Sequence, residues 1–263
     1  MAKLEVPQPI DRIRPRFDEV YDTYIVGGGF FETDEYYKNE KERYWRSLEL
    51  LSRIQLPAPA RVLEIGGGQM AVLRKVLFGD ACTVGDISRD FVRPLQKAEI
   101  EHVIVNLMDP DTGTKLNDQF DLVVLLEVIE HIPLPGHVVI ERIKPLLKPG
   151  GVLFLTTPNL FRLRNLVRMA LGVEFLDRFT LPQPGQGLGH QLEYSADHLQ
   201  WQINRAGMEV VMLEHDNLGA RGHSTKARLA RKLLSPLDIR PKWRNSLAVA
   251  ARRRQSAETT ALR

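Results

Sequence analysis

Cysteine is almost missing from this 263-residue chain, and the single one, Cys82, lies in a stretch of strand character. One thiol excludes an internal disulfide framework, so we expect Cys82 to be a small buried hydrophobic residue in a reducing compartment. Long apolar runs are also missing, because the longest are of strand length and a membrane span needs ~20 residues. Residues 1–5 contain no signal-peptide core. These absences predict a cytoplasmic protein.

Repeats and long low-complexity segments are missing as well, and aromatic residues make up only 7% of the chain. Hydrophobic residues make up 43% and charged residues 26%, which is typical of a globular protein. A chain of 263 residues is long enough to bury one substantial core. The composition therefore predicts an ordinary folded domain and leaves its function to the motifs.

Glycine is most informative in Val62–Gly68, which reads VLEIGGG. A short apolar stretch ends in the carboxylate of Glu64 and in three glycines, and helix-favouring residues follow from Met70 to Phe78. This is the pattern of a buried parallel strand that leads through a glycine turn into a helix and binds a nucleotide there. Any tight strand-to-helix turn also favours glycine, so this motif needs support from elsewhere in the chain.

Support comes about 20 residues later, at the spacing of a ribose-binding acid in nucleotide-binding folds. Residues 81–85 read as a second strand, and Asp86 follows it. Its carboxylate can accept hydrogen bonds from both ribose hydroxyls, and it can equally cap the next helix. A dinucleotide motif would place glycine or alanine at position 71, and this chain has Ala71. Nicotinamide binding therefore stays open on these residues alone.

The order of elements predicts an α/β fold. Seven strands alternate with helices, an order that favours a mostly parallel sheet with helices on both faces; they are expected at 61–65, 81–85, 101–105, 120–126, 151–157, 208–214 and 245–251. Ligands of such sheets bind beyond the carboxyl ends of the strands. Polar side chains follow five of these strands, namely Glu64, Asp86, Asn106, Glu127 and Asn159. We expect them to form one site.

Two further motifs complete a resemblance. Phe120–His131 is a strand that ends in Glu-Val-Ile-Glu-His, and Pro149–Gly151 is a Pro-Gly-Gly turn before the fifth strand. With the glycine motif and Asp86, they make Arg61–Ala251 resemble the class I S-adenosylmethionine-dependent methyltransferases. The resemblance is to the group that acts in ubiquinone, natural-product and surface-glycan pathways. It implies a Rossmann-like seven-stranded sheet whose last strand is antiparallel.

The resemblance also implies a set of site residues. The residues expected around S-adenosylmethionine are Glu64, Gly66, Gly67, Gly68, Asp86, Ile87, Asn106, Leu107 and Glu127. The family often has Asp where this chain has Asn106. The expected catalytic residues are His131, Glu130 and His190, with His131 as the best candidate for a base, since an imidazole titrates near neutral pH. A helix-start histidine that only packs and hydrogen-bonds is the alternative for His131.

A divalent metal is a further expectation. Glu127, Glu130 and His131 are spaced i, i+3 and i+4, which places them on one face if a helix begins at the end of the fourth strand. Two carboxylates and an imidazole suit Mg²⁺, Mn²⁺ or Zn²⁺. The ubiquinone and small-RNA methyltransferases that this segment resembles imply a further histidine ligand, which is His190 here. A metal-free site with His131 as base is the alternative.

The chain divides into a predicted N-terminal helical cap (1–56), a methyltransferase domain (57–254) and a disordered tail (255–263). The cap contains a helix over about 34–54, with Thr33 or Asp34 as its cap residue. The domain carries a lid-like insertion (160–194) and a basic insertion (215–244). In the first insertion, an apolar stripe and three arginines over 162–171 form a basic amphipathic helix. It either packs on the body as a lid over an anionic substrate or lies on an anionic membrane surface.

Charge is polarised along the chain. From His215 to Arg263 there are twelve Lys or Arg and three Asp or Glu, so this part carries +9 within a chain of net charge +3. An anionic partner or a merely solvated basic surface explains this equally well. The predicted function is O-methylation of a small or glycan-like anionic biosynthetic intermediate. The alternatives are an RNA 2′-O-methyltransferase, for which base-stacking aromatic residues are scarce, and a non-catalytic cofactor-binding scaffold. Nothing in the sequence predicts an oligomeric state.

Overall fold

The structure is a computed structural model that describes residues 10–30, 32–89, 92–176, 189–218 and 240–255. Several predictions lie partly outside these ranges: residues 256–263 of the predicted tail, 177–188 of the first insertion and 219–239 of the basic insertion.

A seven-stranded sheet forms the centre of the molecule, in the order β3-β2-β1-β4-β5-β7-β6. The strands are β1 (Arg61–Ile65), β2 (Ala81–Asp86), β3 (Glu101–Ile104), β4 (Phe120–Leu126), β5 (Leu147–Pro158), β6 (Met208–Asp216) and β7 (Ser246–Arg253). β7 pairs antiparallel with both β5 and β6, and the other neighbouring strands pair in parallel. The predicted Rossmann-like sheet with its antiparallel last strand is confirmed. β5 begins four residues earlier than expected, because the Pro-Gly-Gly segment is itself part of the strand.

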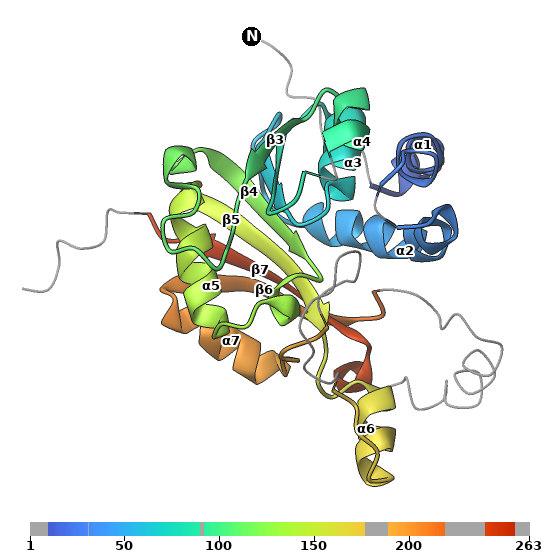
Figure 1. Cartoon of the computed structure of the whole chain (residues 1–263), viewed down its shortest axis with the longest axis vertical. Helices are drawn as coiled ribbons and strands as arrows, with labels where there is room; N and C mark the ends of the chain where they lie inside the picture. Colours follow the sequence, from blue (N-terminus) through green and yellow to red (C-terminus); the bar gives the residue numbers. More distant parts are fainter. Residues whose placement is uncertain (1–9, 31, 90–91, 177–188, 219–239, 256–263) are drawn as a thin grey trace, which may run out of the picture.

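Helices cover both faces of the sheet (Figure 1). On one side lie α1 (Arg14–Val20), α2 (Asp34–Leu51), α3 (Gln69–Phe78) and α4 (Val92–Lys97), and on the other α5 (Gly136–Ile143) and α7 (Ala196–Arg205). A π-helix, η2 (Tyr21–Val26), joins α1 to the loop before α2, and η1 (Ile10–Ile13) precedes α1. Thr33 caps α2, since its side chain accepts a hydrogen bond from the Tyr36 N–H. The predicted helix of the N-terminal cap is confirmed, and it ends at Leu51.

Alternation along the strands divides the core into two layers. Val62, Val124 and Phe154 face the layer that contains α1, α2 and α3. Leu63, Val123 and Leu155 face the layer that contains α5 and α7. Because both faces of these strands are buried, they read as continuous apolar runs, as parallel strands usually do.

Three short 3-10 helices, η3 (Thr114–Leu116), η4 (Ile129–His131) and η5 (Lys144–Leu146), lie near the central strands, and η7 (Pro241–Trp243) precedes β7. The helix α6 (Leu163–Ala170) follows β5 and projects away from the sheet (Figure 1). Within the described ranges, no helix is both long and apolar enough to cross a membrane.

Candidate functional site

A cavity of about 540 Å³ lies at the carboxyl ends of β1, β2 and β4. The chain runs outward from β1 to β3 and then returns to β4 on the other side of β1. This is the switch point at which open α/β sheets bind their ligands. Of the nine predicted cofactor residues, all except Gly68 line the cavity. The polar strand-end residues therefore meet as the topology predicts, with the exception of Asn159, which is buried beyond β5.

The glycine turn is packed so closely that a Cβ atom at Gly66 or Gly68 would clash with a neighbouring side chain. Gly66 has φ of 78°, and a Cβ there would lie 2.8 Å from Cγ2 of Val128. Gly68 has φ of 120°, and its Cβ would lie 2.9 Å from Cδ2 of Leu95. Both conformations are in the region that favours glycine. Gly66 and Gly67 line the cavity, and Gly68 directly precedes α3.

Two carboxylates flank this turn. Glu64 is 1% exposed and accepts a hydrogen bond of 2.7 Å from the Ala71 N–H, and burial raises the pKa of Glu64 to about 7. Asp86 accepts a hydrogen bond of 2.7 Å from the Ser88 N–H, and burial raises its pKa as well. A polar or cationic ligand near these groups would offset the cost of burying their charges.

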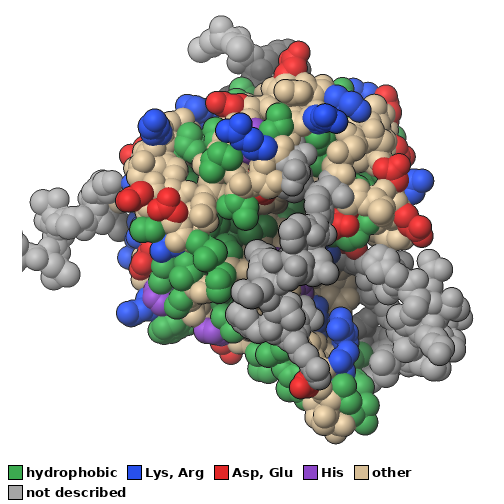
Figure 2. Space-filling view, viewed as in Figure 1, with side chains coloured by type: hydrophobic (Ala, Val, Ile, Leu, Met, Phe, Trp, Pro, Cys, Tyr) green, Lys and Arg blue, Asp and Glu red, His purple; other side chains and the backbone are tan. Residues whose placement is uncertain are grey.

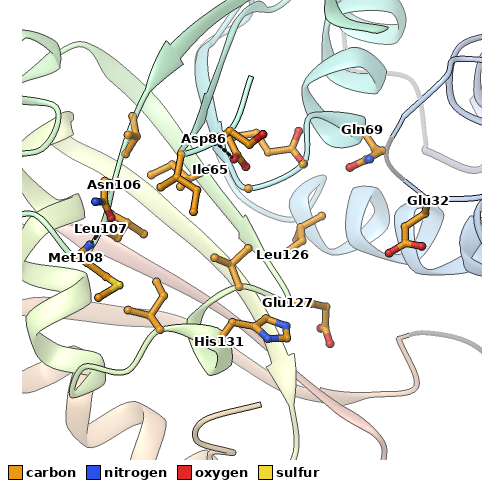
Figure 3. Close-up of a pocket in the computed structure, with 18 of the residues that line it drawn as sticks. Glu32, Ile65, Gln69, Asp86, Asn106, Leu107, Met108, Leu126, Glu127 and His131 are labelled. Carbon is orange, nitrogen blue, oxygen red and sulfur yellow. Dashed lines mark hydrogen bonds between the residues drawn. The ribbon is translucent and has the colours of Figure 1, made fainter. Parts of the chain in front are cut away.

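Asn106, Leu107 and Met108 form another part of the wall, apart from Glu32 and Gln69 (Figure 3). The Asn106 side-chain oxygen accepts a hydrogen bond of 3.0 Å from the Met108 N–H. Asp forms the same kind of local turn. The Asn at position 106, where the family often has Asp, is therefore compatible with the same turn. Ile87 adds an apolar surface and is 64% exposed.

The N-terminal cap supplies part of the cavity wall, through residues that were not among the predicted site residues. Tyr36, Tyr37, Arg43 and Tyr44 of α2 all line the cavity. The Tyr37 hydroxyl accepts a hydrogen bond of 3.1 Å from Gln69 of α3, which ties the cap to the glycine turn.

A buried charge cluster connects the cap to β4. Arg43 pairs with Glu40 at 2.9 Å, and Glu127 lies close enough to act on it electrostatically. Burial alone would lower the pKa of Arg43, but the carboxylates of Glu127 and Glu40 outweigh burial and raise it. Among the described residues, neither Nε of Arg43 nor Oε1 of Glu127 has a hydrogen-bond partner. Both atoms are buried within this cluster.

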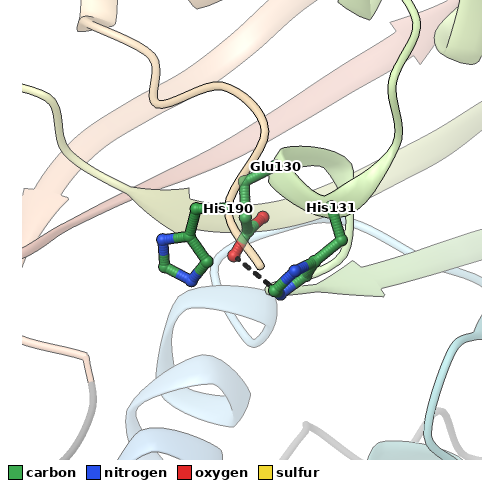
Figure 4. Close-up of side chains that lie close together, drawn as sticks. All are labelled: Glu130, His131 and His190. Atoms are coloured by element: carbon green, nitrogen blue, oxygen red, sulfur yellow. Dashed lines mark ion pairs between the residues drawn. The ribbon is translucent and has the colours of Figure 1, made fainter. Parts of the chain in front are cut away.

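The predicted catalytic residues come together beside the cavity. One ligand atom from each of Glu130, His131 and His190 lies within 4.8 Å of the others. Figure 4 shows the Glu130 carboxylate between the two imidazoles, whose ring centres are 4.9 Å apart. His131 alone of the three lines the cavity, and Figure 3 shows it next to Glu127.

The helix required for the four-residue metal set is not formed. Glu127 has φ of 53°, and the turn that follows is the 3-10 helix η4, which begins only at Ile129. The spacing i, i+3, i+4 therefore does not place the three side chains on one helical face. Glu127 points to the cavity and Arg43, and it lies outside the compact group of Glu130, His131 and His190.

Glu130 is completely buried, and Oε2 accepts a hydrogen bond of 3.1 Å from the Thr157 hydroxyl. Oε1 has no hydrogen-bond partner within the described part of the chain and lies 3.9 Å from Nε2 of His131. Burial first, and then the nearby charge of Glu127, raise the pKa of Glu130 well above its usual range. A positive charge between Glu130 and the histidines would compensate this buried carboxylate.

Another buried acid supports His190. Oε1 of Glu193 lies 3.4 Å from Nδ1 of His190 and also pairs with Arg162. Oε2 of Glu193 accepts a hydrogen bond of 2.6 Å from Asn165. Arg162 and Asn165 belong to the start of α6. The first helix of the predicted insertion is therefore bonded to the residue that holds His190.

Comparison with known proteins agrees with this geometry. A sequence model described as a methyltransferase domain matches residues 36–213. The chain is 30% identical over 174 residues to a ubiquinone biosynthesis O-methyltransferase of Xanthomonas axonopodis pv. citri (strain 306). That match covers 62% of this chain and 68% of the relative.

Solved structures agree on the fold. A SAM-dependent methyltransferase from Archaeoglobus fulgidus is similar with a TM-score of 0.55 at 16% identity, over 82% of this chain and 96% of that one. Phosphoethanolamine N-methyltransferase 2 of Haemonchus contortus, solved with S-adenosyl-L-methionine, is similar with a TM-score of 0.52 at 18% identity. That likeness covers 80% of this chain and 52% of the other. The chain belongs to the class I methyltransferases and is an enzyme that uses S-adenosylmethionine as its methyl donor.

Proposed function

We propose that the enzyme methylates a hydroxyl group of a small or glycan-like anionic biosynthetic intermediate, with His131 as the base. The position of His131 carries this proposal. Figure 3 shows its ring at the opposite side of the cavity from Asp86. A cofactor whose ribose contacts Asp86 would extend from there toward His131, so an acceptor beside His131 would meet its methyl group.

Local contacts favour His131 as a proton acceptor. Nδ1 lies 3.3 Å from the Gly189 carbonyl, so the tautomer that donates this hydrogen bond leaves the lone pair on Nε2. A base of this kind removes the hydroxyl proton as the oxygen attacks the methyl carbon, while the bond from that carbon to the sulfonium sulfur breaks and S-adenosylhomocysteine leaves. The rest of the rate would come from holding the two ligands in line.

Oxygen as the acceptor atom is supported by the name of the relative, which is an O-methyltransferase of ubiquinone biosynthesis. An anionic acceptor is supported by Arg43, a cationic residue of the cavity lining. A guanidinium pairs well with a carboxylate or a phosphate.

A divalent ion also fits the group of Glu130, His131 and His190. One carboxylate and two imidazoles are ligands that Zn²⁺ and Mn²⁺ accept, and Oε1 of Glu130 lacks a hydrogen-bond partner within the described ranges. Such an ion would lower the pKa of the acceptor hydroxyl. Glu127 would then face the acceptor or the cofactor and would not be a ligand.

The acceptor is found by incubating the enzyme with labelled methyl donor and pools of hydroxylated acids, phosphates and anionic sugars, followed by mass analysis of the product. The proposal expects the label on an oxygen of an anionic small molecule. A label on nitrogen or carbon would contradict it. Cofactor binding without turnover of any pool would place the acceptor outside the classes proposed.

Chelation separates the two chemistries at His131. If an ion is required, exhaustive chelation abolishes methyl transfer and Mn²⁺ or Zn²⁺ restores it. If His131 acts alone as base, activity survives chelation and is lost in His131→Ala.

The RNA alternative is tested by gel-shift titration across a series of salt concentrations. We expect no tight RNA binding at physiological salt. Length-dependent binding at nanomolar concentration, with the steep salt dependence of counterion release, would favour RNA 2′-O-methylation instead.

We also propose a cytoplasmic location. The single cysteine supports it, because a chain with one thiol suits a reducing compartment.

A further inference from the structure

Part of the apolar stripe of α6 faces away from the protein. Leu163 and Leu166 of the predicted stripe are half-buried, whereas Val167 and Leu171 are exposed, the latter by 72%. The apolar exposure continues on both sides of the helix, at Phe161 and at Val173. Figure 2 shows hydrophobic side chains over this projecting part of the molecule. Only part of the apolar face expected to pack as a lid therefore packs on the body.

Polar contacts hold α6 in place. Asn165 is the buried residue of the helix, and its side chain donates hydrogen bonds to the Leu160 carbonyl at 3.0 Å and to Glu193 at 2.6 Å. Arg162, which precedes the first turn, pairs with Glu193. Because the helix is attached through Asn165 and Arg162, the side that carries Val167 and Leu171 is available to another surface.

Cationic residues are frequent in α6 and in the segment beside its start. The segment that contains η7 lies against the start of α6, because Asn159 donates hydrogen bonds to the carbonyls of Lys242 and Arg244 at 2.9 and 2.8 Å. We call residues 160–176 and 240–245 the α6–η7 surface. Apart from Arg162, it carries the side chains of Arg164, Arg168, Arg240, Lys242 and Arg244, against the single acid Glu174.

An aromatic residue lies among these cations. The Arg240 guanidinium is 4.7 Å from the ring centre of Trp243, which is half-buried. Figure 2 shows Lys and Arg side chains beside the hydrophobic projection. Exposed apolar side chains together with Arg, Lys and Trp are the composition of surfaces that lie in the interface of a membrane.

A second copy of the chain is the weaker candidate for an occupant. A two-fold interface would bring each surface against itself, and five cations would then face five cations across it. An anionic bilayer offers instead an apolar interior for Leu171 and its neighbours and negative headgroups for the cations. The charge of the surface therefore favours lipid over self-association.

We propose that the α6–η7 surface docks peripherally on anionic phospholipid membranes. Leu171 and Val167 enter the headgroup boundary while the arginines and Lys242 contact lipid phosphates. Figure 1 shows α6 beyond the end of β5, on the strand-end side of the sheet where the cavity lies. Docking would thus hold the active-site edge of the sheet toward the membrane. This inference does not depend on the proposed acceptor.

Vesicle co-sedimentation tests it with the full-length protein and two kinds of vesicle, phosphatidylcholine alone and phosphatidylcholine with 30% phosphatidylglycerol. The proposal expects at least tenfold tighter binding to the anionic vesicles, with loss of that binding as salt increases. The double variant Val167→Ser/Leu171→Ser should reduce it at least tenfold, and so should Arg164→Glu/Lys242→Glu. The matched control Trp201→Ser/Val211→Ser removes two exposed apolar residues of α7 and β6 and should bind like the wild type.

Equal binding to both vesicles, binding to anionic vesicles that does not weaken with salt, or an equal loss in the control variant would overturn the proposal. Self-association that Val167→Ser/Leu171→Ser abolishes, without vesicle binding, would assign the surface to a second copy. If the double variant does not fold, a fluorophore on Leu171→Cys in a Cys82→Ala background gives the same answer. Its emission should shift to the blue with anionic vesicles, and no shift would contradict the docking. Methyl transfer is not a readout here, so failure of this proposal leaves the proposed function untouched.

Discussion

The two sides of the cavity are built in different ways. The cofactor side is local: Glu64, the glycine turn and Ala71 lie within eight residues, and Asp86 follows on the adjacent strand. The acceptor side is assembled from distant segments: Arg43 comes from α2, His131 from η4, and His190 from the chain just before α7. The cofactor side takes its geometry from one strand-turn-helix unit. The acceptor side depends on packing between distant elements, so it can vary while the cofactor side stays the same.

The largest expected effect is on the acceptor side alone. His131→Ala removes the proposed base, or one proposed metal ligand, so methyl transfer should fall roughly 100- to 10,000-fold. Calorimetry should give an unchanged affinity for S-adenosylmethionine. His137→Ala is the matched control, because His137 bonds Gln202 outside the cavity lining. A parallel loss of cofactor affinity in His131→Ala would mean that the two sides are not separable.

On the cofactor side, a substitution should lower the affinity for S-adenosylmethionine. Asp86→Ala should weaken S-adenosylmethionine binding by roughly 1.5–3 kcal/mol if the carboxylate accepts charge-assisted hydrogen bonds from the ribose. Calorimetry measures this directly, with the exposed Asp111→Ala as control. Because Asp86 also bonds the Ser88 N–H, thermal unfolding of the variant must be checked. Unchanged affinity in a folded variant would remove Asp86 from the cofactor site.

Stability should depend on pH through Glu64. Burial raises its pKa to about 7 in the folded protein, above its value in the unfolded chain. Its contribution to the free energy of unfolding is therefore fully present below about pH 4.5 and is lost as pH rises through about 7, by roughly 1–3 kcal/mol. Denaturant unfolding of the ligand-free protein from pH 5 to pH 8 measures this change. The difference between wild type and Glu64→Gln should fall with rising pH, and a constant difference would contradict the buried, protonated carboxyl.

The contrast between the two sides also explains which features could be predicted from the sequence and which could not. The strands and the cofactor motifs follow from apolar runs, glycines and acids whose spacing is set within one or two neighbouring elements. Arg43 and Tyr36 were not predicted, because nothing in a helix sequence tells which of its residues will reach a ligand cavity. The expected helical face of Glu127, Glu130 and His131 did not form, because a strand end that takes φ of 53° and a short 3-10 turn cannot be distinguished from a helix start by spacing. The exposure of Val167 and Leu171 on α6 was also unpredictable, since periodicity gives a face and not its neighbour.

The smallest expected effect concerns Glu193, which positions His190 from behind. Glu193→Gln keeps an oxygen near Nδ1 of His190 but removes the charge, so affinity for Mn²⁺ or Zn²⁺ should fall about tenfold, at the lower end for residues that orient a metal ligand. Affinity for S-adenosylmethionine should not change, because Glu193 does not line the cavity. Calorimetry with each metal alone measures the first value and with the cofactor the second.

A control must separate this orientation from the ion pair that Glu193 makes with Arg162. Arg162→Gln breaks the same pair but leaves Glu193 beside His190, whereas Glu193→Gln leaves the Arg162 charge buried and unpaired. Both variants should lower thermal stability, and only Glu193→Gln should weaken metal binding. The exposed Glu141→Gln of α5 should do neither. Equal metal affinity in all three variants would show that Glu193 serves only to anchor α6. His190 would then reach its position without help from the Glu193 carboxylate.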